Sequence, residues 1–370
     1  MLLTKITLQN YRNYEYVDMR IHNNVNIFIG DNAQGKTNLL ESIYVLSMTR
    51  SHRTHQEKDV IRWNAEETNI NAEIKKKYGE YKLDVNISSR GKKVKINGLE
   101  QKKVSNYIGS LNVVMFAPED LDIVKGAPSI RRRFLDMEIG QVYPSYIYDL
   151  LQYQKVLLQR NNFLKDTNVM TSQTEIMLTV WNEQLANYGI RIIQRRLNFI
   201  EKLQKWVTFI HAGITNHKEN IKIHYMTSIN INENEVDSVL FEQYMVKLTH
   251  IKEQELKRGV TLLGPHRDDL LFTINEKDVK TFGSQGQQRT VALSLKLAEI
   301  ELIHEEIGEY PILLLDDVLS ELDESRQTQL IQTFQEKVQT FITTTSLKGV
   351  HLNKLHNAEI YQVENGKVNR

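Results

Sequence analysis

The sequence predicts an α/β fold built around a phosphate-binding loop, with an antiparallel β meander and an inserted, mainly helical lobe. Three observations support this prediction. A complete phosphate-loop pattern lies near the start of the chain, alternating strands follow it, and long helical repeats occupy the middle.

Residues 30–37 fit the phosphate-loop pattern of glycine, four residues, glycine, lysine and then serine or threonine. The apolar run 25–29 indicates a buried strand leading into the loop, and apolar residues at helical spacing follow it. In such a loop backbone N–H groups bind phosphate oxygens, Lys36 adds a charge near the β and γ phosphates, and the Thr37 hydroxyl can bind Mg²⁺. This strand, loop and helix order disfavours a glycine-rich turn that binds nothing. The predicted nucleotide-binding residues are Gly30, Asp31, Asn32, Ala33, Gln34, Gly35, Lys36 and Thr37.

The composition is that of a globular protein with two or three packed lobes. Of the 370 residues, 41% are hydrophobic and 25% are charged, and cysteine is absent, which excludes disulfides and thiolate metal sites. No apolar run approaches the roughly 18 residues that span a bilayer, and residues 1–5 indicate a strand rather than a secretion signal. We therefore expect a cytoplasmic protein without a membrane partner. The net charge of +1 means that any nucleic-acid surface must come from local segregation of charge.

The first strand is expected over residues 2–8, and a polar-aromatic turn at 11–14 is expected to lead to the strand before the phosphate loop. Residues 49–54 are too polar and basic for a core. Arg50 or Arg53 could reach a nucleotide phosphate or nucleic acid, and a solvated surface turn is an equally open interpretation.

Residues 69–97 alternate with a period of two, which predicts a meander of antiparallel strands. Gly79, Gly91 and Gly98 supply the turns. Positive charge collects on this meander and could bind a DNA backbone, although edge strands also carry lysine simply to avoid aggregation. The basic residues are Lys75, Lys76, Lys77, Lys82, Arg90, Lys92, Lys93, Lys95, Lys102 and Lys103.

The middle of the chain is predicted to be mainly helical, after a buried strand at 112–116. One helix follows Pro128, another follows Pro144, and a third runs from about 175 to 211. Apolar residues at sevenfold spacing on the last two indicate packing of one helix against the other as an arm. The polar run 264–269 is either a functional or a tightly hydrogen-bonded turn.

Two further segments can complete a nucleotide site. Ser284 and Gly286 lie where a helix would present free N–H groups to an anion, although many helices begin with serine and glycine only as caps. The apolar strand 312–315 ends in Asp316 and Asp317, at the edge of a parallel sheet where the phosphate loop also lies. Asp316 would hold Mg²⁺ directly or through water, and Asp317 would orient or deprotonate the attacking water.

This order of elements resembles the ATPase heads of the ABC and structural-maintenance-of-chromosomes families, whose Ser-x-Gly-Gln element binds the γ-phosphate of ATP held by the other subunit. Residues 118–120, 131–136, 264–269 and 320–323 are more narrowly similar to the bacterial RecF family of recombination mediators, over essentially the whole chain. The resemblance implies an ABC/SMC-type ATPase head with an inserted helical lobe. The expected parts are an ATPase lobe over 1–116, a helical lobe over 117–250, and the rest of the ATPase lobe over 251–370 with its Ser-x-Gly-Gln element, Asp-Asp strand and D-loop.

The resemblance also implies a function: an ATP-dependent DNA clamp in replication and recombinational repair. Two subunits would close on two ATP molecules, bind DNA at gaps where single strand meets duplex, and release it after hydrolysis. RecR and RecO would act with the clamp and help RecA to replace single-strand-binding protein. Lys36 and Asp317 would be catalytic, Thr37 and Asp316 would bind the metal, and Ser284, Gly286 and Gln287 would act across the homodimer.

The chain departs from the wider families at three places. Residues 117–120 stand where many relatives carry a metal-sensing glutamine, and either Glu119 or Asp120 could replace it. Asp317 stands where many carry glutamate, and residues 343–345 are threonines where many carry histidine. The shorter carboxylate must recruit its water at longer reach, which predicts slow ATP hydrolysis suited to a timed switch.

Other functions remain as alternatives at the level of sequence. The ATPase subunit of a membrane transporter shares all the nucleotide elements, but it does not require the basic meander or the helical insertion. A nucleic-acid motor needs repeated strand-moving elements, and a small-molecule kinase does not need a second phosphate-binding helix. A DNA-binding scaffold with a vestigial, non-hydrolysing ATP site is the alternative from a different class.

Overall fold

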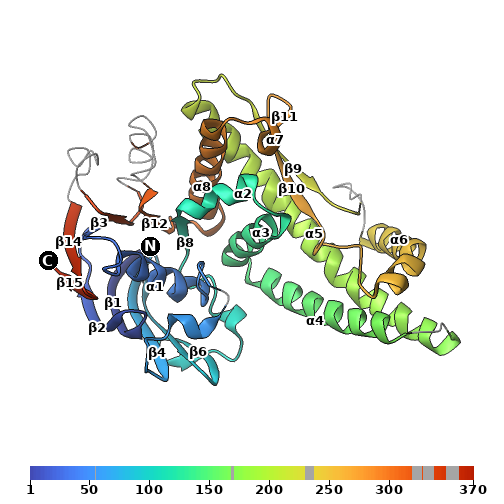
Figure 1. Ribbon diagram of the computed structural model, residues 1–370, viewed down its shortest axis with the longest axis horizontal. Coiled ribbons are helices and arrows are strands. Elements are labelled where there is room, and N and C mark those ends of the chain that lie inside the picture. Colours follow the sequence, from blue (N-terminus) through green and yellow to red (C-terminus); the bar gives the residue numbers. More distant parts are fainter. Residues whose placement is uncertain (55, 168–170, 230–236, 319–326, 328–336, 347–357) are drawn as a thin grey trace. The chain divides into compact units, whose positions relative to one another are not determined.

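The computed structural model describes residues 1–54, 56–167, 171–229, 237–318, 327, 337–346 and 358–370 (Figure 1). The chain forms two compact units. Unit 1 comprises Met1–Leu121, Trp206–Asn220 and Gln285–Arg370, and unit 2 comprises Asp122–Lys205 and Ile221–Ser284.

These units differ from the three consecutive parts expected from the sequence. The helical part continues to Ser284 instead of ending at residue 250, because β10 (Asp269–Ile274) pairs along its length with β9 (Ile221–Met226). A short segment in the middle of the chain, Trp206–Asn220, returns to unit 1.

A mainly parallel sheet lies at the centre of unit 1, with the strand order β15-β14-β3-β13-β12-β8. β3 pairs in parallel with both β13 and β14, and β12 lies between β13 and β8. The parallel strands therefore bring residues 30 and 316 to the same edge of the sheet. The bounds are β3 (Val25–Ile29), β8 (Val113–Phe116), β12 (Ile312–Asp316), β13 (Thr340–Thr344), β14 (Ala358–Glu364) and β15 (Lys367–Asn369).

An antiparallel sheet forms the other layer of unit 1, in the order β2-β1-β4-β5-β6-β7. The predicted meander is confirmed, with alternate residues such as Leu83, Val85 and Ile87 fully buried. The turn at 11–14 closes a hairpin, so a strand that the sequence analysis missed, β2, precedes β3. The bounds are β1 (Leu2–Tyr11), β2 (Tyr14–Arg20), β4 (Glu67–Lys76), β5 (Gly79–Ser88), β6 (Gly91–Ile96) and β7 (Leu99–Glu100).

Two buried helices pack within unit 1. α1 (Lys36–Met48) contacts β12, β13 and β8 of the parallel sheet and β4 and β5 of the antiparallel sheet. It is therefore buried nearly all round, which is why its sequence is apolar on several faces. α8 (Gln285–Ile307) packs on β8 and is similarly buried from Thr290 onward.

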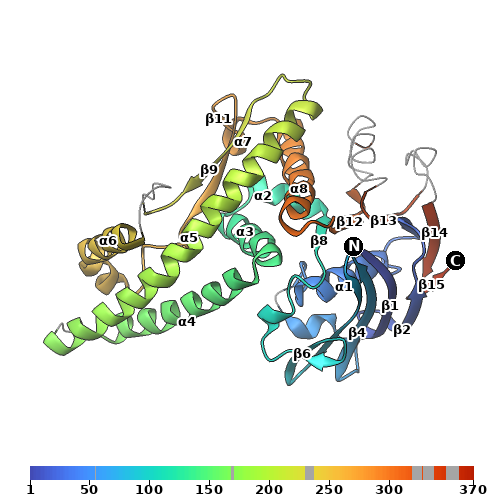
Figure 2. The ribbon, with the colours of Figure 1, turned by 180° about the vertical axis from the view of Figure 1, so that it is seen from behind.

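Unit 2 is built of helices and a three-stranded sheet, β11-β10-β9 (Figure 2). Its helices confirm the predicted arm, since the heptad residues Leu178, Leu185 and Ile192 are almost completely buried. None of the described helices combines the length and hydropathy that a bilayer crossing requires. The bounds are α2 (Leu121–Lys125), α3 (Pro128–Val142), α4 (Pro144–Asp166), α5 (Ser172–Ile214, whose end belongs to unit 1), α6 (Asp237–Arg258), β11 (Lys277–Asp278) and α7 (Val279–Phe282).

The polar run 264–269 is a hydrogen-bonded turn of unit 2. Arg131 forms a two-pronged ion pair with Asp269, at 2.6 and 2.8 Å, and Arg132 donates to the carbonyl of Asp268 at 2.8 Å. The fully buried Arg196 donates to the carbonyl of Pro265 at 2.7 Å. The arginine motif and this turn thus bind each other, which favours a structural role for both.

Candidate functional site

The phosphate loop joins the end of β3 to the first residue of α1, as the sequence predicts. Gly30 lies so close to β14 that a Cβ there would be 2.2 Å from the carbonyl oxygen of Val363. Gly35 has a φ of +116°, and a Cβ there would be 2.9 Å from the hydroxyl of Tyr14. Close packing therefore requires both glycines, and the left-handed backbone conformation also requires the second.

The ammonium of Lys36 lies inside the loop. Its Nζ donates to the carbonyl oxygens of Gly30 and Asp31, at 2.6 and 2.8 Å. Burial lowers the pKa of Lys36, and the carboxylates of Asp317, Asp31 and Asp316 oppose that change. The side chain is thus preorganised with its charge where a phosphate oxygen would bind.

Thr37 and Asp316 meet at the edge of the parallel sheet. The Thr37 hydroxyl donates to Asp316 Oδ1 at 2.9 Å, and Thr343 donates to the same oxygen at 2.7 Å. Burial raises the pKa of the Asp316 carboxyl, while the hydrogen bonds from the two threonines oppose that rise. A hydroxyl and a carboxylate side by side fit Mg²⁺, which usually takes one or two protein oxygens together with phosphates and water.

Asp317 follows in a left-handed backbone conformation, with a φ of 52°. Its N–H donates to Thr343 Oγ1 at 2.9 Å, so one threonine binds both acids of the Asp-Asp strand. Thr343 stands in the region where many relatives carry histidine, and here it orients Asp316 and Asp317 together.

The two acids after β8 have different surroundings. Asp120 turns back and accepts a hydrogen bond from the N–H of Ala117 at 2.8 Å. Burial raises the pKa of Asp120, and the charge of Lys296 on α8 opposes that rise. Glu119 is exposed and acts on Asp316 through its charge, raising the pKa of that carboxyl. Of the two acids, Glu119 is therefore the one whose charge acts on Asp316.

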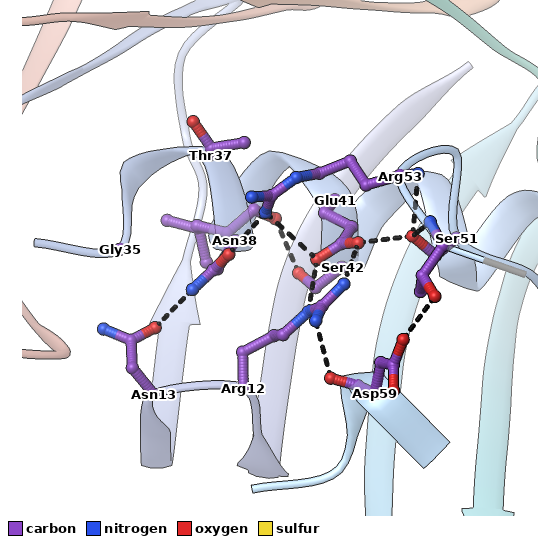
Figure 3. A network of polar contacts seen from close by, with 12 residues as sticks. Arg12, Asn13, Gly35, Thr37, Asn38, Glu41, Ser42, Ser51, Arg53 and Asp59 are labelled. Atoms are coloured by element: carbon purple, nitrogen blue, oxygen red, sulfur yellow. Dashed lines mark hydrogen bonds and ion pairs between the residues drawn. The ribbon is translucent and has the colours of Figure 1, made fainter. Parts of the chain in front are cut away.

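A second polar network lies beside the phosphate loop (Figure 3). Arg12 forms a two-pronged ion pair with Glu41 of α1, at 2.7 and 2.9 Å, and Ser51 also binds this carboxylate. Arg53 donates to Asn38 Oδ1 at 2.9 Å, whereas Arg50 is exposed. The sequence analysis considered Arg53 but missed Arg12 and Glu41. A carboxylate within the apolar helix after the loop was the signal that could have revealed them.

A groove of about 800 Å³ opens next to this network. Asn13 lies in its wall and donates to the carbonyl of Gln34 in the phosphate loop at 3.0 Å, so the groove adjoins the loop. Trp63, with 91% of its surface exposed, is part of the lining. Asn10, Arg12 and Asn64 line the groove with positive φ angles, a conformation that non-glycine residues adopt rarely.

The remaining predicted residues lie at the beginning of α8. Ser284 is the last residue of unit 2, while Gly286 and Gln287 belong to unit 1. The carbonyl of Gly286 accepts a hydrogen bond from the Thr290 hydroxyl, and the Gln287 amide donates to Glu219, at 2.9 Å each. The predicted D-loop, residues 320–323, lies outside the described residues.

The chain matches known proteins along its whole length. The family profile described as "RecF/RecN/SMC N terminal domain" matches residues 2–369. The "DNA replication and repair protein RecF" of Oceanobacillus iheyensis is 53% identical over 369 residues, which cover 100% of both chains. The protein of the same description from Bacillus mycoides is 53% identical and covers 100% of this chain and 98% of its own. The chain belongs to the RecF family.

Solved structures agree with this assignment to the RecF family. A recombination mediator protein RecF of the RecFOR pathway, described as RecF-ATPrS, superimposes with a TM-score of 0.91 at 36% identity, covering 100% of this chain and 97% of its own. The form described as RecF-ATP gives a TM-score of 0.90 at 36% identity, covering 99% and 96%. The Smc head domain of Pyrococcus furiosus, with a TM-score of 0.53 at 13% identity and coverage of 99% and 95%, shares the fold. The predicted ABC/SMC-type head with a helical insertion is thus confirmed.

Proposed function

We propose that this RecF-family chain is an ATP-dependent DNA clamp in replication and recombinational repair, whose slow hydrolysis of ATP acts as a release switch. The observation that carries the proposal is the convergence of Lys36, Thr37, Asp316 and Asp317 at one edge of the parallel sheet. We assign the ATPase lobe to unit 1 and the helical lobe to unit 2.

In the proposed site, Gly30, Asp31, Asn32, Ala33, Gln34 and Gly35 surround the phosphates together with Lys36 and Thr37. Thr37 and Asp316 hold Mg²⁺, which neutralises charge on the phosphates, and Asp317 orients the attacking water. Glu119 takes the position of the usual metal-sensing glutamine. We expect turnover well below the typical enzyme rate of about 10 per second, and a far faster ATPase would contradict the switch.

We propose that the groove lined by Trp63 binds the base of the nucleotide. The exposed indole offers a stacking surface, and the groove adjoins the phosphate loop through Asn13. Asn10 and Asn64 carry amides that can hydrogen-bond to the edge of a base.

The second half of each site comes, in this proposal, from the other copy of a homodimer. Ser284, Gly286 and Gln287 would close over the γ-phosphate of the ATP that the partner holds. Their position at the beginning of a 23-residue helix supports this role, because the helix dipole places partial positive charge there, which favours an anion.

DNA would bind at gaps between single strand and duplex, with RecR, RecO and RecA as the pathway partners in the cytoplasm. The meander provides fewer cations than its sequence suggests. Lys82 pairs with Glu73, Lys92 pairs with Glu57, and Lys76 is turned inward onto the carbonyl of Ser110 at 2.9 Å. We propose as DNA contacts the exposed lysines Lys75, Lys93, Lys95 and Lys102.

Sedimentation with and without ATP tests the proposal, repeated with a short gapped duplex. We expect ATP to produce dimers and to raise DNA affinity, and we expect Lys36→Met to abolish both effects because the phosphate loop loses its charge. Normal ATP-driven dimers in Lys36→Met would remove the loop from the mechanism. A wild-type chain that binds DNA equally well with and without ATP would favour the scaffold with a vestigial site.

A further inference from the structure

A ring of polar side chains in unit 1 joins the end of α5 to the beginning of α8. Gln287 Nε2 donates to Glu219 Oε1 at 2.9 Å, and Glu219 Oε2 lies 3.1 Å from His211 Nε2. On the other side of the imidazole, Nδ1 lies 2.9 Å from Ser294 Oγ. The end of α5 and the helix α8 lie side by side in both views (Figures 1 and 2).

A second branch closes the ring along α8. The Ser294 hydroxyl lies 2.8 Å from the carbonyl oxygen of Thr290, and the Thr290 hydroxyl donates to the carbonyl of Gly286 at 2.9 Å. Starting from His211, one branch therefore ends at Gln287 through Glu219, and the other runs along α8 from Ser294 past Thr290, whose hydroxyl reaches the carbonyl of Gly286. Both branches end on the proposed γ-phosphate element.

The ring of polar side chains is largely buried. His211 and Ser294 are 0% exposed and Thr290 is 3% exposed, while the Glu219 side chain keeps 21% exposure. Burial lowers the pKa of His211, and Glu219 opposes that change. A neutral imidazole that donates from Nε2 to the Glu219 carboxylate accepts at Nδ1, where the Ser294 hydroxyl then donates. A buried polar group that loses its partner costs about 1–3 kcal/mol, so these contacts hold one arrangement.

The route of the chain adds a second argument. Trp206–Asn220 is the only part of the described middle region that returns to unit 1, between two stretches of unit 2. Both His211 and Glu219 belong to this return. The contacts they make are therefore those that attach the returning segment to the first turns of α8.

We infer that Glu219 and His211 are positioning residues that hold Gly286 and Gln287 in the conformation needed to close over the partner's ATP. The inference rests on the proposed function of the Ser-x-Gly-Gln element and adds two residues outside the known nucleotide motifs. Glu219 fixes the Gln287 amide directly, and His211 fixes Glu219 and, through Ser294, the helix itself.

This role separates two properties of the protein. The hydrogen bonds given above for the ring do not include a residue of the phosphate loop. A single subunit without Glu219 should therefore bind ATP as the wild type does. The Gln287 amide would then lose its bond to Glu219, and closure of the dimer would have to restore the order of this side chain at an entropic cost.

A double-mutant cycle in the full-length chain tests the inference, using the wild type, Glu219→Ala, Gln287→Ala and the double variant. Sedimentation with ATP and Mg²⁺ gives the dimer dissociation constant, and titration at concentrations where the chain is monomeric gives ATP affinity. We expect each single variant to raise the dimer dissociation constant about tenfold, as loss of a charge-assisted hydrogen bond predicts, and we expect Glu219→Ala to leave ATP affinity unchanged. The double variant should be no weaker than Gln287→Ala alone.

Glu305→Ala is the matched control, because Trp206 Nε1 donates to the exposed Glu305 at 2.7 Å and joins the same two helices outside the ring. It should dimerise as the wild type does. Three results would overturn this inference without touching the proposed function. These are dimerisation of Glu219→Ala as in the wild type, a parallel loss of its ATP affinity, and additive effects in the double variant. A wild type that stays monomeric with ATP would overturn the proposed function as well.

Discussion

At the scale of single residues, Glu41 is a carboxylate with no exposed surface, and it depends on Arg12. Burial raises the pKa of Glu41, but hydrogen bonds from Arg12 and Ser51 and the charges of Arg12 and Arg53 outweigh burial and bring it below its usual value. A carboxyl with a lowered pKa stabilises the fold above its unfolded pKa and loses that contribution as the pH falls.

We therefore expect Arg12→Ala to lower the free energy of unfolding by about 3 kcal/mol at pH 7, because it leaves a buried charge uncompensated. The difference from the wild type should narrow at acidic pH, as the carboxyl of Glu41 becomes protonated and no longer needs the guanidinium. Urea unfolding from neutral to acidic pH measures the difference in unfolding free energy between the variant and the wild type. Arg62→Ala, which removes an ion pair with the exposed Glu15, should cost less than about 1 kcal/mol. A penalty for Arg12→Ala that does not change with pH would contradict this account.

The left-handed backbone of Asp317 makes asparagine its best replacement, since asparagine adopts positive φ readily and keeps the N–H bond to Thr343. We expect Asp317→Asn to bind ATP and dimerise but to hydrolyse ATP at least about 10²-fold more slowly. Single-turnover hydrolysis beside equilibrium ATP binding measures both properties. Asp316→Asn should instead weaken ATP binding only when Mg²⁺ is present. Unchanged turnover in Asp317→Asn would show that another group orients the water.

Whether a site residue could be predicted from the sequence depends on whether its partners lie nearby in the chain. The phosphate loop and the two aspartates could be predicted because their spacing within short segments defines the chemistry. Arg12 and Glu41 could not, because the two lie in different elements and meet only after β1 pairs with β4 and α1 packs between the sheets. The same reason explains why Lys76 was wrongly grouped with the basic residues that could bind DNA. Its side chain points inward to the carbonyls of residues 109 and 110, which are distant in sequence.

At the scale of elements, the strand β14 lies so close to the phosphate loop that it limits which residue can occupy position 30. Gly30→Ala would drive a methyl group against the Val363 carbonyl, which is backbone and cannot rotate away. We expect a loss of about 1–3 kcal/mol in unfolding free energy and weaker ATP binding, measured by urea unfolding and by ATP titration. Gly308→Ala, where the Cβ meets no neighbour and only the positive φ is strained, should cost about 1 kcal/mol and leave ATP binding unchanged. Equal effects of the two variants on ATP binding would count against this role of β14.

Elements with strong periodicity were predicted well, and the strands β2 and β14 were missed. The strand before the loop, the meander, the helices of the arm and α8 all follow from apolar spacing. β2 carries charged residues at most of its outward positions, so its alternation is hard to distinguish from a loop, and β14 places the charged Glu359 inward and the apolar Ile360 outward. The order of strands in the parallel sheet depends on contacts between distant segments, which periodicity does not encode.

At the scale of the whole molecule, DNA binding must come from local charge, because the chain carries a net charge of only +1. We expect DNA affinity to fall steeply with salt, and we expect Lys93→Glu together with Lys95→Glu to weaken it and to reduce the salt slope by about 2. Fluorescence anisotropy at several salt concentrations measures both quantities. Lys205→Glu with Lys257→Glu changes net charge equally outside the meander and should have a smaller effect. Identical losses in the two variants would mean that the meander has no special part in binding.

The parallel sheet has a consequence for synthesis of the protein on the ribosome. β3 emerges early, yet both strands that flank it, β13 and β14, belong to the last tenth or so of the chain. The nascent phosphate loop therefore has no completed sheet beside it until residues 340–364 have been synthesised. A message truncated shortly before codon 340 would yield a polypeptide that keeps every phosphate-loop residue but lacks the neighbours that hold them in place.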